Sequence, residues 1–193
     1  MLKKLAFVAA VLAASCLIAG LSYAEEITVA DFDSGSKPCN IGGDFGAWDK
    51  DPADFSQGCS DNFDPVEKMG PKGFSIRLDY DVDSPNPAYN GFWLKLNNLD
   101  AAKYKNLSFV VKGDAEAGYT TVFKVELKNN KGEVGKFYVT GIDDSWQTIS
   151  IPLRNFSGIV DFKGLAEFVI VFEDRMATNK DGTIYIDEIK LTD

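Results

Sequence analysis

Apolar and polar residues alternate over much of the chain that follows residue 73. The alternation is clearest in the segment 74–80, where every second position is apolar: Phe74, Ile76, Leu78 and Tyr80. Further strand-like segments follow at 92–96, 107–111, 123–127, 137–139, 147–151, 168–172 and 183–191, and a short one precedes them at 26–32. A period of two gives a β-strand one apolar face, and no stretch has a sustained helical period. The pattern therefore predicts about nine strands in an all-β, two-sheet antiparallel sandwich.

Local signals indicate how neighbouring segments connect. Asn129-Asn130-Lys131-Gly132 stands between two alternating runs and predicts a β-hairpin, while Asn97-Asn98 predicts a turn. In the last segment Ile184 and Ile186 share one face, but Ile189 and Leu191 resume that face one residue out of phase. A β-bulge at Asp187-Glu188 would keep both pairs in the core.

Residues 33–73 are rich in Gly, Asp, Pro and Asn and have little periodicity. Cys39 and Cys59 both lie in this segment, flanked by residues that are typical of loops. In an oxidising compartment we expect the two cysteines to form a disulfide that closes a loop of about 20 residues and contributes about 3 kcal/mol. The segment would then be a long loop pinned by the disulfide. The alternatives are a disordered segment and two free buried thiols.

The first 24 residues have the features of a signal peptide. Lys3 and Lys4 form a basic start, an apolar run extends over 5–21, and Ser22-Tyr23-Ala24 supplies the small residues of a cleavage site before Glu25. We therefore expect residues 1–24 to be cleaved and residues 25–193 to form one exported domain, periplasmic or secreted. The alternatives are a membrane anchor, because the run approaches the roughly 20 residues that span a bilayer, and a lipoprotein modified at Cys16.

The balance of charges and the lack of histidine narrow the range of functions. The predicted signal peptide contains two of the 20 basic residues and none of the 29 acidic ones, which leaves 18 basic residues and a mature formal charge of −11. Such a surface repels nucleic acid and anionic lipid but tolerates neutral ligands such as sugars. Without histidine, the chain lacks the commonest general base and transition-metal ligand, and it has no Walker-type phosphate-binding loop.

Five segments resemble one family of domains and occur in the same order as in that family. They are 30–33 (Ala-Asp-Phe-Asp), 40–43 (Asn-Ile-Gly-Gly), 107–114 (Leu-Ser-Phe-Val-Val-Lys-Gly-Asp), 146–153 (Trp-Gln-Thr-Ile-Ser-Ile-Pro-Leu) and 184–189 (Ile-Tyr-Ile-Asp-Glu-Ile). Over residues 25–193 the chain resembles exported jelly-roll domains with a galactose-binding-like fold. This family includes carbohydrate-binding modules of bacterial glucanases and the complex I intermediate-associated protein domain. The resemblance implies a jelly-roll β-sandwich, and it is compatible with several functions because the members bind different things.

The resemblance also implies a calcium ion near the point where the first and last strands meet. In this chain that point would place Asp31 or Asp33 beside Asp187 or Glu188. Calcium takes about six to eight oxygen ligands, which carboxylates and backbone carbonyls supply. We therefore expect a structural calcium site at these acids. The alternative is that they are solvated loop charges.

Aromatic and polar side chains that are out of phase with the core mark a candidate ligand-binding face. The candidates are Trp93, Tyr138, Arg77, Asp79 and Glu126, together with Tyr89, which precedes a strand and would stand at the rim of a cleft. If their strands are neighbours in one sheet, these side chains share a face. Aromatic rings stack on the apolar faces of sugars, while carboxylates and guanidinium groups bind sugar hydroxyls. The alternative is a set of cross-strand ion pairs on a solvated face.

These features lead to one preferred function and two alternatives. We expect a non-catalytic carbohydrate-binding module that takes a polysaccharide or oligosaccharide in an open cleft. The first alternative is a protein-interaction or assembly module of the cell envelope. The second is a glycoside hydrolase, since two carboxyl groups about 5–10 Å apart suffice for that chemistry, but no pair, Asp79 with Glu126 included, stands out. We expect no nucleic-acid partner and no stable membrane insertion after signal cleavage.

Overall fold

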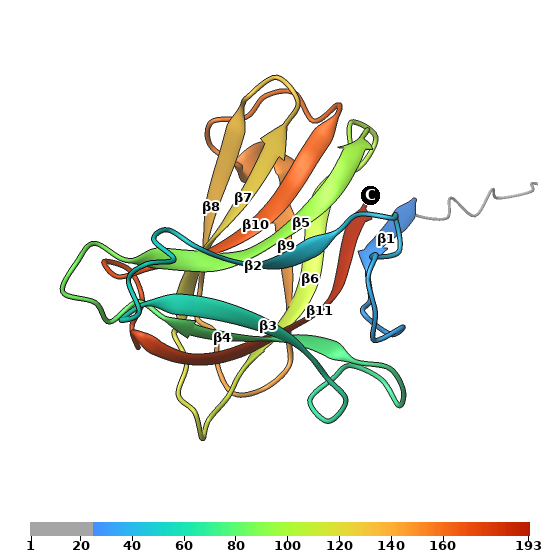
Figure 1. The fold of residues 1–193 in the computed structure, drawn as a ribbon. Helices are drawn as coiled ribbons and strands as arrows, with labels where there is room; N and C mark the ends of the chain where they lie inside the picture. Colours follow the sequence, from blue (N-terminus) through green and yellow to red (C-terminus); the bar gives the residue numbers. More distant parts are fainter. Residues whose placement is uncertain (1–24) are drawn as a thin grey trace, which may run out of the picture.

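Two antiparallel β-sheets packed face to face make up the protein (Figure 1). The computed structural model describes residues 25–193, so the predicted signal peptide lies outside the described residues. The first sheet contains β1 (Glu26–Ala30), β3 (Gly58–Asp64), β4 (Ser75–Asp81), β6 (Asn106–Gly113), β9 (Gln147–Pro152) and β11 (Asp181–Thr192). The second contains β2 (Phe45–Asp49), β5 (Tyr89–Leu99), β7 (Val122–Asn129), β8 (Val134–Thr140) and β10 (Leu165–Glu173). The predicted all-β sandwich is confirmed.

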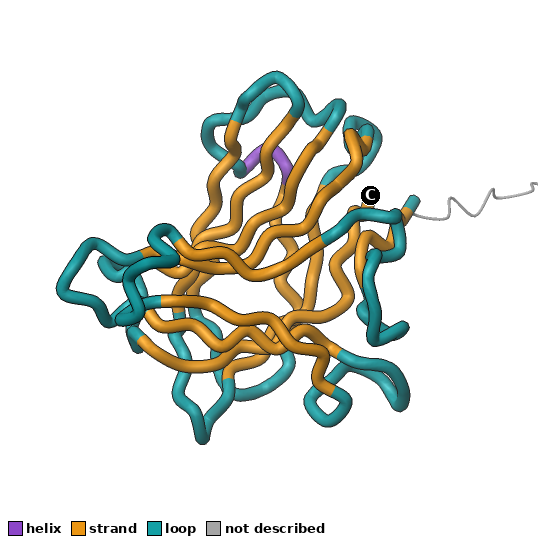
Figure 2. Tube along the Cα trace, viewed as in Figure 1, coloured by secondary structure: helices purple, strands orange, loops and turns teal. Residues whose placement is uncertain are grey.

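The order of strands shows how the chain passes between the sheets. The first sheet runs β3-β4-β11-β6-β9 with β1 also paired to β11, and the second runs β2-β5-β10-β7-β8. Loops lie at the ends of the strands, and Leu153–Asn155 form the single short helical turn of the described chain (Figure 2). Within residues 25–193 there is no helix long and apolar enough to cross a membrane.

Apolar side chains from both inner faces fill the space between the sheets. Phe92 and Phe168 of the second sheet and Phe109 of the first are fully buried. Tyr80 of β4 stacks on Phe172 of β10 with ring centroids 4.1 Å apart, so this pair joins the two sheets. Most of the buried positions are those that the alternation assigned to apolar faces, although outward residues such as Val169 and Tyr185 are also buried.

The segment 33–73 contains two strands, β2 and β3, that its composition did not predict. β2 pairs with β5, and β3 pairs with β4, each at the edge of its sheet. Carboxylates bridge these two edge strands, since Asp49 Oδ1 accepts from Cys59 N–H at 2.6 Å and Asp61 Oδ1 accepts from Ala47 N–H at 2.8 Å. The expectation of a strandless loop is wrong because the pairing partners stabilise these strands, not a local apolar period.

The predicted disulfide is not formed, and Cys39 and Cys59 are free thiols. Cys39 lies before β2, where its N–H donates to the carbonyl of Gly43 at 2.9 Å, whereas Cys59 contacts Asp49 at the end of β2. The five residues of β2 span about 16 Å at about 3.3 Å per residue. Disulfide-bonded Cα atoms are about 5.5 Å apart, so strand β2 keeps the two cysteines from pairing.

The structure confirms two of the three local signals. The β7–β8 hairpin closes at Asn129, whose N–H donates to the carbonyl of Glu133 at 3.1 Å. The register of β11 shifts after Asp187, and Glu188 has a φ of 53°, which is the predicted bulge. The turn expected at Asn97-Asn98 is instead a bulge inside β5, with φ values of 53° and 60°, because the strand continues to Leu99.

Candidate functional site

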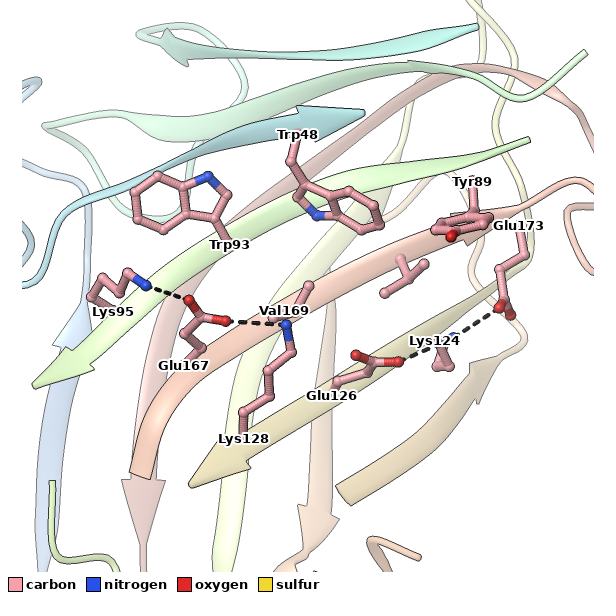
Figure 3. Close-up of a pocket in the computed structure, with 11 residues that line it drawn as sticks. Trp48, Tyr89, Trp93, Lys95, Lys124, Glu126, Lys128, Glu167, Val169 and Glu173 are labelled. Atoms are coloured by element: carbon pink, nitrogen blue, oxygen red, sulfur yellow. Dashed lines mark hydrogen bonds and ion pairs between the residues drawn. The ribbon is translucent and has the colours of Figure 1, made fainter. Parts of the chain in front are cut away.

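A cleft of about 550 Å³ lies on the outer face of the second sheet. Strands β2, β5, β10 and β7 supply its lining. Figure 3 shows aromatic rings along one side, charged side chains along the other, and Val169 between them. The cleft therefore combines apolar surface with convergent polar groups, which is the usual character of a ligand-binding site.

The cross-strand register brings the lining residues together from distant parts of the sequence. Trp93 of β5 is opposite Val169 of β10, and Val169 is opposite Glu126 of β7. Directly opposite residues point to the same face of a sheet. Their neighbours Leu94 and Phe168 are buried in the core, so the same period of two that builds the core presents this row on the outer face.

Trp48, Tyr89 and Trp93 form an aromatic wall along β2 and β5. The rings of Trp48 and Tyr89 meet edge to face with centroids 5.9 Å apart. Gly91 lies opposite Trp48, and Gly46 lies opposite Trp93. A Cβ atom at Gly46 would be 3.6 Å from the Trp93 indole, so the indole packs directly against the backbone of β2. The absence of a side chain at Gly46 thus leaves room for the Trp93 indole, whereas a Cβ atom at Gly91 would clash with the carbonyl oxygen of Ile170 on β10.

One ion-pair network in the opposite wall is centred on a lysine. The Lys124 ammonium lies 3.1 Å from Glu126 Oε1 and 2.8 Å from Glu173 Oε1. Tyr138 donates its hydroxyl to Glu173 Oε2 at 3.3 Å. Burial disfavours the ammonium, but the hydrogen bonds to Glu173 and Glu126 outweigh that cost and raise the pKa of Lys124. The network therefore holds two carboxyl groups in fixed positions beside the cleft.

The second network is centred on a glutamate. Glu167 contacts Lys95 through one oxygen, and its other oxygen lies 3.1 Å from Lys128 Nζ. Burial disfavours the carboxylate, but the hydrogen bonds from Lys95 and Lys128 outweigh it and lower the pKa of Glu167 from its usual 4.5. Lys95 Nζ also lies 5.4 Å from the centroid of the Trp93 ring, which further fixes its position.

Two loops are joined by hydrogen bonds at the Tyr89 end of the cleft. Asp54, in the loop after β2, accepts hydrogen bonds from Ser84 Oγ at 2.9 Å and Asn86 Nδ2 at 3.2 Å, both in the loop before β5. Lys50 donates to a backbone carbonyl of that same loop at 2.7 Å, and its Nζ lies 5.3 Å from the Tyr89 ring centroid. Tyr89 directly follows one of these loops, and Lys50 of the other loop lies over its ring.

The structure brings together four of the six predicted ligand-binding residues. Trp93, Tyr89 and Glu126 line the cleft, and Tyr138 on β8 stands beside it, opposite Lys124 of β7. These side chains share the outer face of one sheet. The alternation predicts only that Trp93, Glu126 and Tyr138 point away from the core. Their role in ligand binding remains a prediction.

Arg77 and Asp79 are the exceptions, and their assignment to the same face is wrong. Both lie on β4, which belongs to the first sheet. Arg77 Nε donates to Asp79 Oδ1 at 2.8 Å, and Thr183 Oγ1 donates to the same oxygen at 2.6 Å. The whole sandwich separates this group from Glu126, so Asp79 and Glu126 are also too far apart to act as a hydrolytic pair.

Several cleft residues were not among the predicted ones. They are Trp48, Lys95, Lys128, Glu167, Val169, Val171 and Glu173. Trp48 lies in the segment 33–73, where no clear alternation marks an outward face. On β10 the continuous apolar run 168–172 hides two outward positions, Val169 and Val171. The signal that identifies the outer face was present in the charges that flank the run, Glu167 and Glu173, which are in phase with those valines.

The four acids of the expected calcium site fall into two groups. Asp187 is buried at the β11 bulge, where it accepts from Met69 N–H at 3.0 Å and Glu188 N–H at 2.7 Å. Burial raises its pKa to about 6, and the negative charges of Glu188 and Asp33 add to that shift. Asp31 instead exchanges hydrogen bonds with Asn40, at 2.9 and 2.7 Å.

These positions fit a bound cation only in part. A buried carboxylate beside two like charges is stabilised by a cation, which agrees with a role for Asp187. Glu188, however, is paired with Lys190 at 2.7 Å, and Asp31 is committed to Asn40. Across residues 25–193, no three His, Cys, Asp or Glu side chains are grouped so that they could hold a metal ion. A cation here would need backbone carbonyls or movement of Glu188.

Comparisons with solved structures reveal related folds. The family 11 carbohydrate-binding module of the cellulosomal cellulase Lic26A-Cel5E of Clostridium thermocellum superposes with a TM-score of 0.63 at 23% identity, covering 88% of this chain and 95% of that one. The family 11 module from Clostridium thermocellum in complex with a β-1,3-1,4-mixed-linked tetrasaccharide gives a TM-score of 0.63 at 22% identity, covering 86% and 94%. A family 30 carbohydrate-binding module is more distant, with a TM-score of 0.52 at 18% identity over 68% and 73%.

A comparison of the sequence with models of known protein families shows to which family the chain belongs. No curated protein sequence matches it. The model described as "Carbohydrate binding domain (family 11)" matches residues 21–192, which include all of the strands. The match covers most of the chain, and the related structures agree with the fold. The chain therefore belongs to the family 11 carbohydrate-binding modules.

Proposed function

We propose that this protein is an exported, non-catalytic module that binds a polysaccharide or oligosaccharide in the open cleft of its second sheet. The observation that carries the proposal is the pairing of a wall of three aromatic rings with a wall of fixed charges across an apolar floor. Sugars have apolar ring faces and polar edges, so the two walls match the two kinds of sugar surface.

Each wall has a defined role in this proposal. Trp48, Tyr89 and Trp93 offer apolar surface to the ring faces of the sugar, and Val169 and Val171 exclude water beneath it. The carboxylates of the opposite wall accept hydrogen bonds from sugar hydroxyls, while the lysines donate to them. Because the ion pairs already fix these groups, little side-chain entropy is lost when the ligand binds.

We propose a β-linked glucan as the first ligand to test. The solved structure of the Clostridium thermocellum module holds a β-1,3-1,4-mixed-linked tetrasaccharide, and the present chain has the same fold and belongs to the same family. Catalysis is not part of the proposal. A general acid for glycoside hydrolysis needs a raised pKa, whereas the pKa of Glu167 is lowered by its two lysine partners.

A titration of residues 25–193 with soluble polysaccharides and oligosaccharides tests the proposal. We expect saturable binding of a β-glucan, and a loss of about tenfold or more in affinity for Trp93→Ala. Trp146→Ala is the matched control, because Trp146 lies beside Tyr185 of the first sheet, away from the cleft. No binding across the panel by the folded protein would contradict the proposal and favour an envelope protein as the partner.

We further propose that a calcium ion binds beside Asp187 and stabilises the fold. Support comes from the burial of this carboxylate next to the negative charges of Glu188 and Asp33. Such a site lies at the first sheet, so the ion would be structural and would not contact a sugar in the cleft. The expected result is a higher unfolding temperature with calcium than with a chelator. An unchanged unfolding temperature would contradict this part of the proposal.

A further inference from the structure

The charged wall of the cleft is electrically polarised from one end to the other. At one end, which we call the basic end, Lys95 and Lys128 share the single carboxylate of Glu167. At the other end Lys124 is shared by two glutamates. Figure 3 shows the two groups on either side of Val169. The basic end thus has one positive charge in excess, whereas at the other end Lys124 is enclosed by its two glutamates, with Lys136 opposite Glu126 and Lys50 near Tyr89 offsetting their remaining charge.

The excess positive charge is available to a ligand. The Lys95 and Lys128 side chains are 48% and 37% exposed, whereas Lys124 is only 10% exposed between its glutamates. Each ammonium has three donors, and one carboxylate with two oxygens cannot use all six. Nearby Lys37 and Asp44 pair with each other at 3.5 Å, so they leave this balance unchanged.

The two ammonium groups are also held close together. Both contact the same carboxylate, and Lys95 is fixed further by the Trp93 ring. A second anion that approaches from the open side can therefore accept hydrogen bonds from both lysines without ordering them first. The net negative charge of the whole protein opposes this only weakly, because charges more than about 8 Å away are screened at physiological salt.

We propose that the basic end of the cleft binds a carboxylate carried by the glycan, so that the module prefers acidic over neutral oligosaccharides. This inference rests on the proposed carbohydrate-binding function of the same cleft. At the Glu126 and Glu173 end Lys124 is buried between the two glutamates and offers no free donor to a carboxylate, so the acidic sugar is directed to Lys95 and Lys128. The polarity therefore also fixes the direction in which the chain lies along the cleft.

A glycan can carry a carboxylate at its end, as an aldonic acid, or within the chain, as a uronic acid, and the experiment separates these two cases. Calorimetric titrations compare a neutral β-glucan tetrasaccharide with the same chain oxidised to an aldonic acid at its reducing end, and with a tetrasaccharide that contains an internal uronic acid. We expect one or both acidic ligands to bind about tenfold more tightly than the neutral one at low salt. The preference should shrink as salt is added, because the contact is exposed.

Three variants assign the preference to the basic end. Lys128→Met should reduce the ratio of acidic to neutral affinity towards one. Glu167→Gln should increase that ratio, because it removes the carboxylate that competes for both lysines. Lys103→Met is the matched control: it removes the same charge from an exposed side chain that pairs with Glu25 outside the cleft, and it should leave the ratio unchanged.

The possible outcomes show whether the acidic preference alone fails or the carbohydrate-binding function fails with it. Equal affinity for acidic and neutral ligands, or tighter binding of the neutral one, overturns the preference but leaves the carbohydrate-binding function intact. An equal effect of Lys103→Met and Lys128→Met also overturns it, since net charge alone would then explain the result. If the folded protein binds none of the three ligands or other glycans, the proposed function fails and this inference fails with it.

Discussion

Asp187 is the one acidic side chain in the buried core of residues 25–193, and its titration gives a direct test of the calcium proposal. The side chain is 1% exposed, and burial raises its pKa from 3.8 to about 6. The folded protein therefore binds this proton more tightly than the unfolded chain does. The free energy of unfolding that the group contributes is complete below pH 3.8, and it is lost as the pH rises through about 6.

The size of this effect follows from the two pKa values. They differ by about two units, and each unit is worth about 1.4 kcal/mol, so the loss is about 3 kcal/mol between pH 4 and pH 7. The value needs no large reduction for solvent screening, because the carboxylate is almost fully buried. In a protein of this size such a loss is a large part of the total stability.

Urea unfolding with a chelator present, followed by tryptophan fluorescence, measures the effect. The wild type and Asp187→Asn are compared across this pH range, so that the difference between them isolates the one carboxylate. The N–H groups of Met69 and Glu188 donate to different oxygens of Asp187, and the amide replaces one of these oxygens with an NH2 donor, which adds a constant cost. With saturating calcium the wild type should regain its stability at pH 7, because a cation favours the ionised carboxylate.

Parallel pH profiles for the two proteins in chelator would refute the reasoning about the buried charge. If the wild type loses stability with rising pH as expected, but calcium does not restore that stability at pH 7, only the calcium proposal would be refuted. Both readouts come from unfolding, so neither depends on whether a sugar ligand has been identified.

Three further predictions concern packing, charge and the thiols. Phe172→Ala should lower the free energy of unfolding by about 3–5 kcal/mol in chemical denaturation, because it removes a fully buried ring stacked on the other sheet; a loss below about 1 kcal/mol would contradict the packing. Affinity for a neutral sugar should be constant in titrations from about pH 5 to pH 9, since the pKa of Glu167 is lowered from 4.5 and that of Lys124 is raised from 10.5; a titration step within that range would argue against these networks. A reducing agent should not change the thermal unfolding temperature, because Cys39 and Cys59 are unpaired, and a decrease would indicate a disulfide.

The strands that bury one face could be predicted from the sequence because burial acts on local spacing. The apolar period of 74–80 corresponds to β4, and the out-of-phase pairs of the last segment correspond to the bulge at Glu188. The hairpin at Asn129 was predictable for a similar reason, since turn chemistry depends on a few adjacent residues.

Strands held by distant partners could not be predicted in this way. β2 and β3 have weak local patterns, and they form because β5 and β4 present unpaired edges to them. The cysteines illustrate the same limit. Cys39 and Cys59 are close in sequence and have the composition of a linked loop, but β2 lies between them and holds them at opposite ends of a strand.

The candidate site also has features that local sequence determines and features that depend on distant partners. The sequence by itself determined that Trp93, Glu126 and Tyr138 point away from the core, because the period of two fixes the face of each strand. Only the tertiary structure decided which outward faces belong to one sheet: it placed Arg77 on the far side of the sandwich and set Glu167 between two lysines. The reason is physical, since the side on which a residue lies depends on its own strand, whereas its neighbours depend on the pairing order of the strands, which the free energy of the whole core selects.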